Sequence, residues 1–189
     1  DGSWELFLQP VASSFHVRVG EKVVYKNRKR YIAHDWLKMP ASGMNRNEAV
    51  NYTQWLSASG RLLGAHLCDE YEWERAARGG DDREFPHGNE LDGSEANIDE
   101  SHEKNETLVG PDEVGSHSQS RSPFSVDDMA GNVNEWVVSV LENEAAVIRS
   151  GGFFYTPITA RSTNRSVVSA AMKDPAIGFR VCARLSQKG

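Results

Sequence analysis

The stretch from residue 80 to residue 126 constrains the fold of this chain more than any other part of the sequence. It is dominated by Asp, Glu, Ser, Gly, His, Asn and Pro, and it contains few apolar side chains. A loop of this length inside a compact domain is usually functional, or it is organised by something other than an apolar core. Bound metal is one such organiser. The sequence therefore predicts a domain in which much of the backbone is irregular.

Regular structure is expected on both sides of this stretch. Near the N-terminus apolar residues alternate in two short segments separated by a break that contains Pro10: Trp4, Leu6, Leu8, and then Phe15, Val17, Val19. This period of two predicts short antiparallel strands. Two more strands are expected, one over residues 137–141 and a closing one over residues 177–182.

A first helix is predicted between Asn45 and Gly60. Asn45 has the side chain of a good N-cap, and Glu48 follows three residues later, which is the spacing of a capping box. The buried side of this helix should consist of Ala49, Tyr52, Trp55 and Leu56.

A second helix is predicted from Asp69, again with an acid three residues on at Glu72, to the Gly79–Gly80 pair. Its apolar side should consist of Tyr71, Trp73, Ala76 and Ala77. The acids Asp69, Glu70, Glu72 and Glu74 resemble paired catalytic carboxylates. We interpret them instead as surface groups, because a helix dipole favours negative charge in the first turn.

The composition excludes several classes of protein. The chain of 189 residues, with 39% apolar and 25% charged side chains, is long enough for one globular domain and shows no internal repeats. Its net charge of −6 argues against a nucleic-acid partner, which would require a basic face. The basic run at residues 26–30 is interpreted as a polar connection. No apolar run approaches the ~18 residues of a membrane span, so we expect no membrane contact by this chain.

The two cysteines, Cys68 and Cys182, are too few for a disulfide scaffold, and their spacing leaves open whether they pair. The chain begins at Asp1 without a methionine, so we expect it to be part of a longer protein, whose upstream part would decide its compartment.

The segment DDMAGNVNEW, residues 127–136, places carboxylates and turn-forming residues immediately before a large aromatic. Calcium takes six to eight oxygen ligands from carboxylates, amides and carbonyls. Gly131 and Val133 are two positions apart, so in extended backbone their carbonyls point the same way, while Asp128 and Glu135 add carboxylates from either end. Trp136 would enter the core. A solvated turn before a buried strand is the alternative.

Several motifs occur in an order that resembles the formylglycine-generating enzyme, or sulfatase-modifying factor, family: GR at 60–61, EYEWERAARGG at 70–80, FPHG at 85–88, AN at 96–97, DMAGNVNEW at 128–136, RSGG at 149–152, RS at 161–162 and GFR at 178–180. The match covers about residues 40 to 184, and it is specific because independent motifs keep their order. It implies an α+β, C-type-lectin-like fold with short antiparallel strands, two main helices and much irregular loop. Residues 40–189 would form the family domain, and residues 1–39 would be N-terminal strands of the same domain or a linker.

The resemblance also implies structural calcium. One site would use the side chains of Asp128 and Glu135 with the carbonyls of Gly131 and Val133. This chain has Asn134 where the family often has tryptophan, so the rim of the site differs. A second family site begins at Asn97 and Ile98. In this chain Glu106, which stands where an aspartate is usual, and the carbonyl of Leu108 would continue it.

The oxidase branch of the family converts a sulfatase cysteine to formylglycine with copper held by two cysteines. Counted from Gly151–Gly152, these positions are Thr156 and Arg161 here, and neither can bind copper(I). Cys68 and Cys182 lie elsewhere in the sequence. The six histidines show no metal-binding spacing and are interpreted as scattered core or surface residues. We therefore expect no copper and no oxidase activity.

The function class that remains after these exclusions is a binding module. The segments at 64–73, 111–117, 120–124 and 160–165 resemble family members fused to bacterial serine/threonine protein kinases, where the domain looks like a sensor of a protein or small-molecule ligand. The implied ligand face is the loop at 153–175, with Phe154, Tyr155, Thr156, Arg161 and Asn164. A loop that only covers the core is the alternative for each of these residues. The alternative function is the variable protein of a diversity-generating retroelement, and an active oxidase is a further, disfavoured one.

Overall fold

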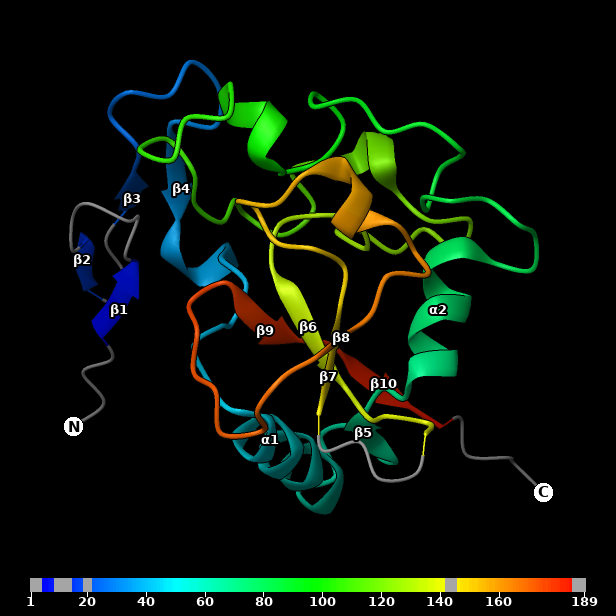
Figure 1. The fold of residues 1–189 in the computed structure, drawn as a ribbon. Coiled ribbons are helices and arrows are strands. Elements are labelled where there is room, and N and C mark those ends of the chain that lie inside the picture. The colour runs from blue at the N-terminus through cyan, green and yellow to red at the C-terminus, as the bar shows by residue number, and fades with distance from the viewer. Residues whose placement is uncertain (1–4, 9–14, 19–21, 142–145, 185–189) are drawn as a thin grey trace.

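The computed structural model of the chain describes residues 5–8, 15–18, 22–141 and 146–184, and side chains from residue 22 onward. Trp4 and Val19 of the predicted N-terminal strands lie outside the described residues. The described residues form two α-helices, α1 (Arg46–Ala58) and α2 (Glu70–Arg78). They also form the short 3₁₀ helices η1 (Trp36–Lys38), η2 (Asp99–His102), η3 (Ser118–Ser120) and η4 (Pro157–Ala160). The stretch from residue 80 to 126 is irregular apart from η2 and η3, as the sequence predicts (Figure 1).

The strands are short and form small sheets. Three two-stranded antiparallel sheets pair β1 (Glu5–Leu8) with β2 (Phe15–Arg18), β3 (Lys22–Val24) with β4 (Ala33–Asp35), and β5 (Ala65–Leu67) with β10 (Val181–Ala183). The central sheet has the order β8 (Ser166–Val167), β7 (Val147–Arg149), β6 (Asn134–Val137), β9 (Ile177–Phe179). The β6–β9 pair is parallel, an arrangement that the prediction of antiparallel strands did not include. It arises because the long connection from β6 to β9 returns the chain to the same end of the sheet.

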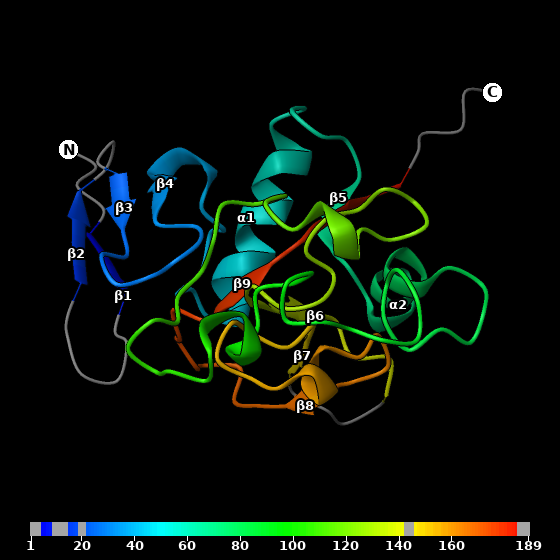
Figure 2. The same ribbon diagram turned by 90° about the horizontal axis from the view of Figure 1, so that it is seen from above.

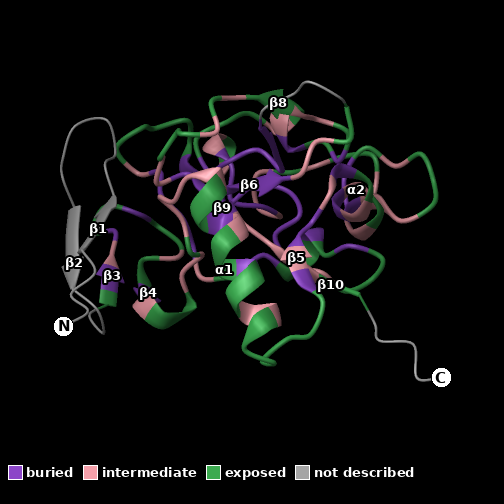
Figure 3. Ribbon diagram, turned by 90° about the horizontal axis from the view of Figure 1, so that it is seen from below, coloured by how far each residue is buried: buried purple, intermediate pink, exposed green. Residues whose placement is uncertain are grey.

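Strand β6 is the centre of the molecule, and all four of its residues are buried (Figure 3). Trp136 is fully buried on one side, as predicted. Its cluster contains residues of α1, β5, β7 and β9 and the residue before β7: Ala49, Leu67, Ile148, Ile177 and Ala146. The neighbouring cluster contains the fully buried Trp73 of α2 with Cys68, Ala77, Met129, Val137 and Val147. Side chains that alternate along one strand thus enter two adjacent cores.

Both predicted capping boxes are confirmed. Asn45 accepts a hydrogen bond from the backbone N–H of Glu48 at 2.9 Å, and Glu48 accepts one from Asn45 at 2.8 Å. Asp69 and Glu72 make the same reciprocal pair before α2. The first turns therefore begin where the local sequence places them.

The buried side of α1 differs from the prediction. Ala49 is buried, but Tyr52 and Trp55 are 47% and 48% exposed, and Thr53 is buried in their place. The helix packs on β5 through small residues, so the large rings lie on its flank. There Tyr52 contacts Trp55 and Phe179, with ring centroids 5.7 and 5.6 Å apart.

On α2 the prediction holds for Trp73 and Ala77 and is wrong for Tyr71, which is 73% exposed. It is also wrong for Glu70, which was interpreted as a surface acid and is buried. The burial is possible because two arginines neutralise its carboxylate, as described below.

Two strand boundaries are also corrected. The strand predicted over residues 137–141 begins at Asn134 and ends at Val137, because the segment around Trp136 is the buried part of this stretch. The single closing strand predicted over residues 177–182 is two strands, β9 and β10, which pair in different sheets.

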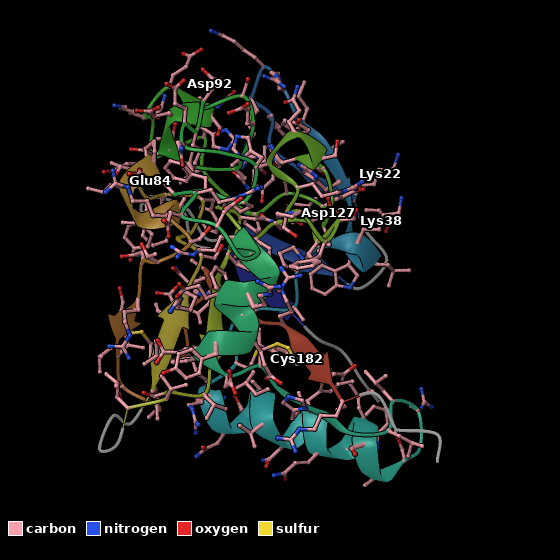
Figure 4. The ribbon with its side chains drawn as sticks, turned by 90° about the vertical axis from the view of Figure 1, so that its right-hand side faces the viewer. Lys22, Lys38, Glu84, Asp92, Asp127 and Cys182 are labelled. Atoms are coloured by element: carbon pink, nitrogen blue, oxygen red, sulfur yellow. A yellow bond between two sulfur atoms is a disulfide. The ribbon has the colours of Figure 1, made fainter. Side chains whose placement is uncertain are left out.

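Cys68 and Cys182 form a disulfide that joins the start of α2 to β10 across a sequence separation of 114 residues. The sulfur bridge lies beside the buried cluster of Trp73 (Figure 4). A cross-link stabilises a protein mainly by restricting its unfolded chain, and it does so more for longer loops. The open question of pairing is thus answered by the fold, which brings together two residues far apart in the sequence.

Replacing both cysteines by alanine should lower the free energy of unfolding by up to about 4.7 kcal/mol, the value for a loop on the order of 100 residues. Guanidinium unfolding measures this difference, and reductant should lower the stability of the natural chain but not of the double variant. Two reactive thiols in the denatured, unreduced natural chain would contradict the disulfide.

Candidate functional site

The loop at residues 153–175, here called the ligand loop, presents an exposed aromatic pair. Phe154 and Tyr155 are each 39% exposed, and their ring centroids lie 4.1 Å apart. Thr156 and Arg161 are also exposed, on either side of η4. Asn164 is only partly exposed and donates a hydrogen bond to the carbonyl of Thr159 at 2.8 Å. Four of the five predicted ligand residues therefore reach the surface, whereas Asn164 also fastens the loop to itself.

The backbone beneath the aromatic pair is held in place. Phe153 is buried against Val109, Val133 and Ala176, and its N–H donates to the carbonyl of Asn132 at 2.8 Å. The carbonyl of Tyr155 accepts a hydrogen bond from the N–H of Asp99 at 3.1 Å. A binding surface that is ordered before it meets its ligand loses less conformational entropy on binding.

The middle of the ligand loop is fastened to α2 by charge. The buried carboxylate of Glu70 accepts hydrogen bonds from Arg165 at 2.8 and 2.9 Å and from Arg149 at 3.2 Å. The hydrogen bonds from Arg165 are the main reason why the pKa of Glu70 falls to about 2, with smaller contributions from the N–H of Val140 and the charges of both arginines. Arg149 also binds the carbonyl of Ser162 at 2.6 Å.

The two positions that would carry copper ligands offer none. Thr156 is the residue before η4, and the guanidinium of Arg161 forms an ion pair with Glu84 at 3.0 Å. A hydroxyl and a guanidinium are not ligands for copper(I), which prefers thiolates. The chain has two cysteines, and both are used in the disulfide, which lies well away from Glu84 (Figure 4).

A separate groove of about 480 Å³ lies between α1, β5 and α2. His66 and Glu72 line it, with the imidazole Nε2 2.9 Å from the carboxylate. A hydrogen bond with the carbonyl of Gly64 and then Glu72 raise the pKa of His66. None of the predicted ligand residues lines this groove.

The first predicted calcium site is a buried turn rich in oxygen. Asp128 has a φ of 57° and is 7% exposed, and it accepts a hydrogen bond from the N–H of Gly115 at 2.7 Å. Burial raises the pKa of Asp128, and the nearby charge of Glu135 adds to the shift. No ion pair forms on Asp128 among the residues that the structure describes.

Glu135, the other carboxylate of this turn, is already bound from two sides. It accepts hydrogen bonds from the indole N–H of Trp73 at 2.7 Å and from Arg180 at 2.7 and 3.0 Å. The carbonyl of Gly131 accepts one from the hydroxyl of Ser150 at 3.1 Å. Arg180 is paired with Glu135, and the charges of His117 and Arg180 also act on Asp128. The oxygen donors fit calcium in kind, and Asp128 is the carboxylate of this turn that has no ion pair among the described residues.

The second predicted set does not come together. Glu106 is exposed, and the carbonyl of Leu108 is bound by the guanidinium of Arg28 at 2.5 Å. Asn97 is buried, but its side chain contacts His102, Asn132 and the carbonyl of Gly110. The backbone carbonyl of Ile98 accepts from Ser101. These four residues therefore do not fit a calcium ion as a set.

A buried group of charged side chains and histidines lies at the second predicted calcium site, and the sequence analysis does not predict it. The run at residues 26–30 was interpreted as a polar connection, yet Arg28 is buried and pairs with the fully buried Asp112 at 2.6 Å. His34 and His117, interpreted as scattered, both contact Asp112, at 3.2 and 2.8 Å. Burial would raise the pKa of Asp112, but the hydrogen bonds of the histidines and the charge of Arg28 hold it below its usual range. The alternating apolar residues Val23 and Tyr25, which precede Arg28, indicate that the chain enters the core just before this run.

Among the described residues, no group of three or more His, Cys, Asp and Glu side chains is arranged to hold a metal ion, and no helix is both long and apolar enough to span a bilayer. The fold and the exposed loop define a formylglycine-generating-enzyme-like domain without the thiolate pair of the oxidases. The sequence matches the family described as "Sulfatase-modifying factor enzyme 1-like domain" over residues 10–185. The chain belongs to this family, as its motifs predict.

Two curated relatives are bacterial kinases. The chain is 31% identical over 116 residues to the serine/threonine-protein kinase pkn1 of Chlamydia caviae, and 29% identical over 116 residues to that of Chlamydia pneumoniae. Each match covers 61% of this chain and 16% of the kinase, so the chain corresponds to a small part of either protein.

Solved structures share the fold at low identity. Treponema denticola variable protein 1 matches with a TM-score of 0.69 and 16% identity, and PvdO from Pseudomonas aeruginosa with 0.68 and 24%. Both alignments cover 97% of this chain and 92% of the other. CarF matches with a TM-score of 0.65 and 19% identity over 79% of this chain and 69% of its own. Together they confirm the predicted fold class.

Calcium at the Asp128 turn stays a prediction, and it can be tested by melting. We expect calcium to raise the melting temperature relative to chelator, since a ligand of the folded state at a hundredfold excess over its Kd adds about 2.7 kcal/mol. Asp128→Asn should abolish this response while its amide oxygen still accepts from Gly115. The matched control Glu106→Gln should leave it unchanged. Identical melting curves in calcium and chelator would refute the site.

Proposed function

We propose that this chain is a non-catalytic binding module of the sulfatase-modifying factor family, and that its ligand loop recognises a protein or small-molecule ligand. The observation that carries the proposal is the exposed Phe154–Tyr155 pair, whose backbone is held at Phe153 and Tyr155 and, further along the loop, at Arg165. Aromatic side chains offer large contact areas at small entropic cost, and they dominate the energy of many interfaces.

The two kinase relatives support a sensor within a larger protein. We propose that the complete protein carries a serine/threonine kinase domain upstream of this chain, and that ligand binding acts on that domain. The structural role of calcium at Asp128 belongs to the same proposal, because the ion would stabilise the turn behind the ligand loop without taking part in binding.

The second candidate function is that of a variable protein of a diversity-generating retroelement, and it is supported by the match to Treponema denticola variable protein 1. If a retroelement diversified the ligand loop, the coding DNA of the loop would show adenine-directed substitutions against a nearby template repeat. The two candidates share a binding function and differ in how the loop acquires its sequence.

The absence of oxidase activity is a separate expectation. Supplied with copper, oxygen and reductant, the purified chain should not convert the cysteine of a sulfatase-type peptide to formylglycine, because Thr156 and Arg161 replace the thiolates. Mass spectrometry of the peptide measures the conversion, with a known family oxidase as the positive control. Turnover comparable to that control would end the binding-module proposal.

The ligand loop is tested by variants that keep the fold. Tyr155→Ala and Arg161→Ala should change the free energy of unfolding by no more than about 0.5 kcal/mol, since both side chains are exposed. Peptides selected on the natural chain from a phage-displayed library should bind Tyr155→Ala at least about tenfold more weakly, a loss of about 1.4 kcal/mol.

Tyr71→Ala is the matched control, because it removes an exposed tyrosine from α2. It should keep the affinity of the selected peptides. If Tyr155→Ala and Arg161→Ala both fail to fold, the loop is scaffold. If the peptides bind all three variants equally, the recognition face lies elsewhere, and the groove of His66 is the next candidate.

A further inference from the structure

The guanidinium of Arg28 is surrounded by oxygen atoms in the way that a metal ion would be. Its three nitrogens donate to the carbonyl of Leu108 at 2.5 Å, the carbonyl of Gly110 at 2.8 Å and the carboxylate of Asp112 at 2.6 Å. A fourth oxygen, the carbonyl of Tyr31, lies at 3.4 Å. These three acceptors lie two positions apart on one loop, and all three face the guanidinium.

The surroundings of Arg28 are built for a buried cation. Its side chain is 1% exposed, and the charge lies 3.6 Å from the centre of the Tyr25 ring, which attracts cations through its face. The hydroxyl of Tyr25 donates to the carbonyl of Pro111 at 2.9 Å. A Cβ at Gly110 would lie 2.5 Å from that hydroxyl, so glycine is required for the ring to approach.

The charge of Arg28 is also balanced. Asp112 is fully buried and meets Arg28, His34 and His117, so its carboxylate has no free side for a second cation. The amide of Asn97, which the family resemblance assigns to calcium, donates instead to the carbonyl of Gly110, the same oxygen that Arg28 binds. A divalent ion placed among these oxygens would meet the guanidinium at contact distance, which strong repulsion in a buried place forbids.

We propose that Arg28 is a built-in cation that takes the place of the second calcium ion implied by the family resemblance. The segment at residues 22–39 thereby supplies the positive charge that organises the loop at residues 97–112 (Figure 2). This half of the domain folds without metal, and residues 22–39 are an integral part of it. The backbone of Val114 donating to the carbonyl of Lys38 at 2.9 Å extends the same contact.

The test uses Asp128→Asn as the parent chain, so that the first calcium turn does not contribute. In this parent, melting should be the same in calcium, magnesium and chelator. Adding Arg28→Ala should lower the melting temperature in chelator by on the order of 10 °C, because it leaves a buried carboxylate unpaired. Calcium should restore part of that loss and magnesium much less, since magnesium dehydrates reluctantly.

Lys29→Ala is the matched control, because Lys29 is the next cation along the chain and its only described ion pair, with Glu103, is exposed. It should neither destabilise the parent nor create a calcium response. Arg28→Lys keeps the charge but loses the forked donor geometry, so it should be less stable than the parent. Its melting temperature should still not change with calcium.

Three results would overturn the proposal. One is a parent with Arg28 intact that binds calcium and loses this binding on Asn97→Ala. Another is a folded Arg28→Ala chain that gains no calcium response. The third applies if the Arg28→Ala chain does not fold. The Arg28→Lys chain is then titrated with calcium. A rise in its melting temperature would show that the oxygen atoms around residue 28 prefer the ion to a side-chain cation.

Discussion

The carboxylate of Glu135 is the interaction on which the rest of the structure depends. It lies on the central strand β6. It accepts hydrogen bonds from the indole of Trp73 on α2 and from the guanidinium of Arg180, which is the residue between β9 and β10. Three segments that are far apart in the sequence therefore meet at one buried side chain. The next residue, Trp136, turns to the opposite core, so one dipeptide determines both how α2 lies on the sheet and how the sheet contacts α1.

Around this centre, buried polar contacts hold the loops in place, as apolar packing does in most domains. The loops between residues 80 and 126 contribute Phe85, Ala96, Ile98 and Val109 to two small hydrophobic clusters. Their backbone is held by Asn97, Asn132, Asp112 and Arg28, each of which is buried and hydrogen-bonded. Buried polar networks of this kind are costly when one partner is lost, and they select a single arrangement when they are complete. At the Asp128 turn one carboxylate has no ion pair among the described residues, whereas Arg28 and Asp112 pair with each other.

Local features of the fold could be predicted from the sequence, and distant ones could not. Both capping boxes involve residues three apart, and the irregular middle follows from its own composition. By contrast, the pairing of Arg28 with Asp112 spans 84 residues, and that of Cys68 with Cys182 spans 114.

Periodicity also failed on α1, where it predicts that Tyr52 and Trp55 are buried. The helix contacts β5 through Ala49 and Thr53, and helical spacing alone cannot show which of two adjacent stripes the neighbouring strand will cover. For the candidate site, the motif order predicts that residues 153–175 reach the surface, but it gave no information on which of their side chains, such as Asn164, bond to the loop itself.

The disulfide closes a covalent ring that runs from Cys68 to Cys182. The ring contains α2, the long polar loops, the Asp128 turn and the whole ligand loop, whereas α1 and residues 22–39 lie outside it. A protease that cuts once in any exposed loop within the ring cannot release a fragment, because both new ends remain joined through the sulfur bridge. The loop at residues 153–175 is thus protected against a single cleavage by topology, while the segment that carries Arg28 depends only on noncovalent contacts once the chain is cut before α1.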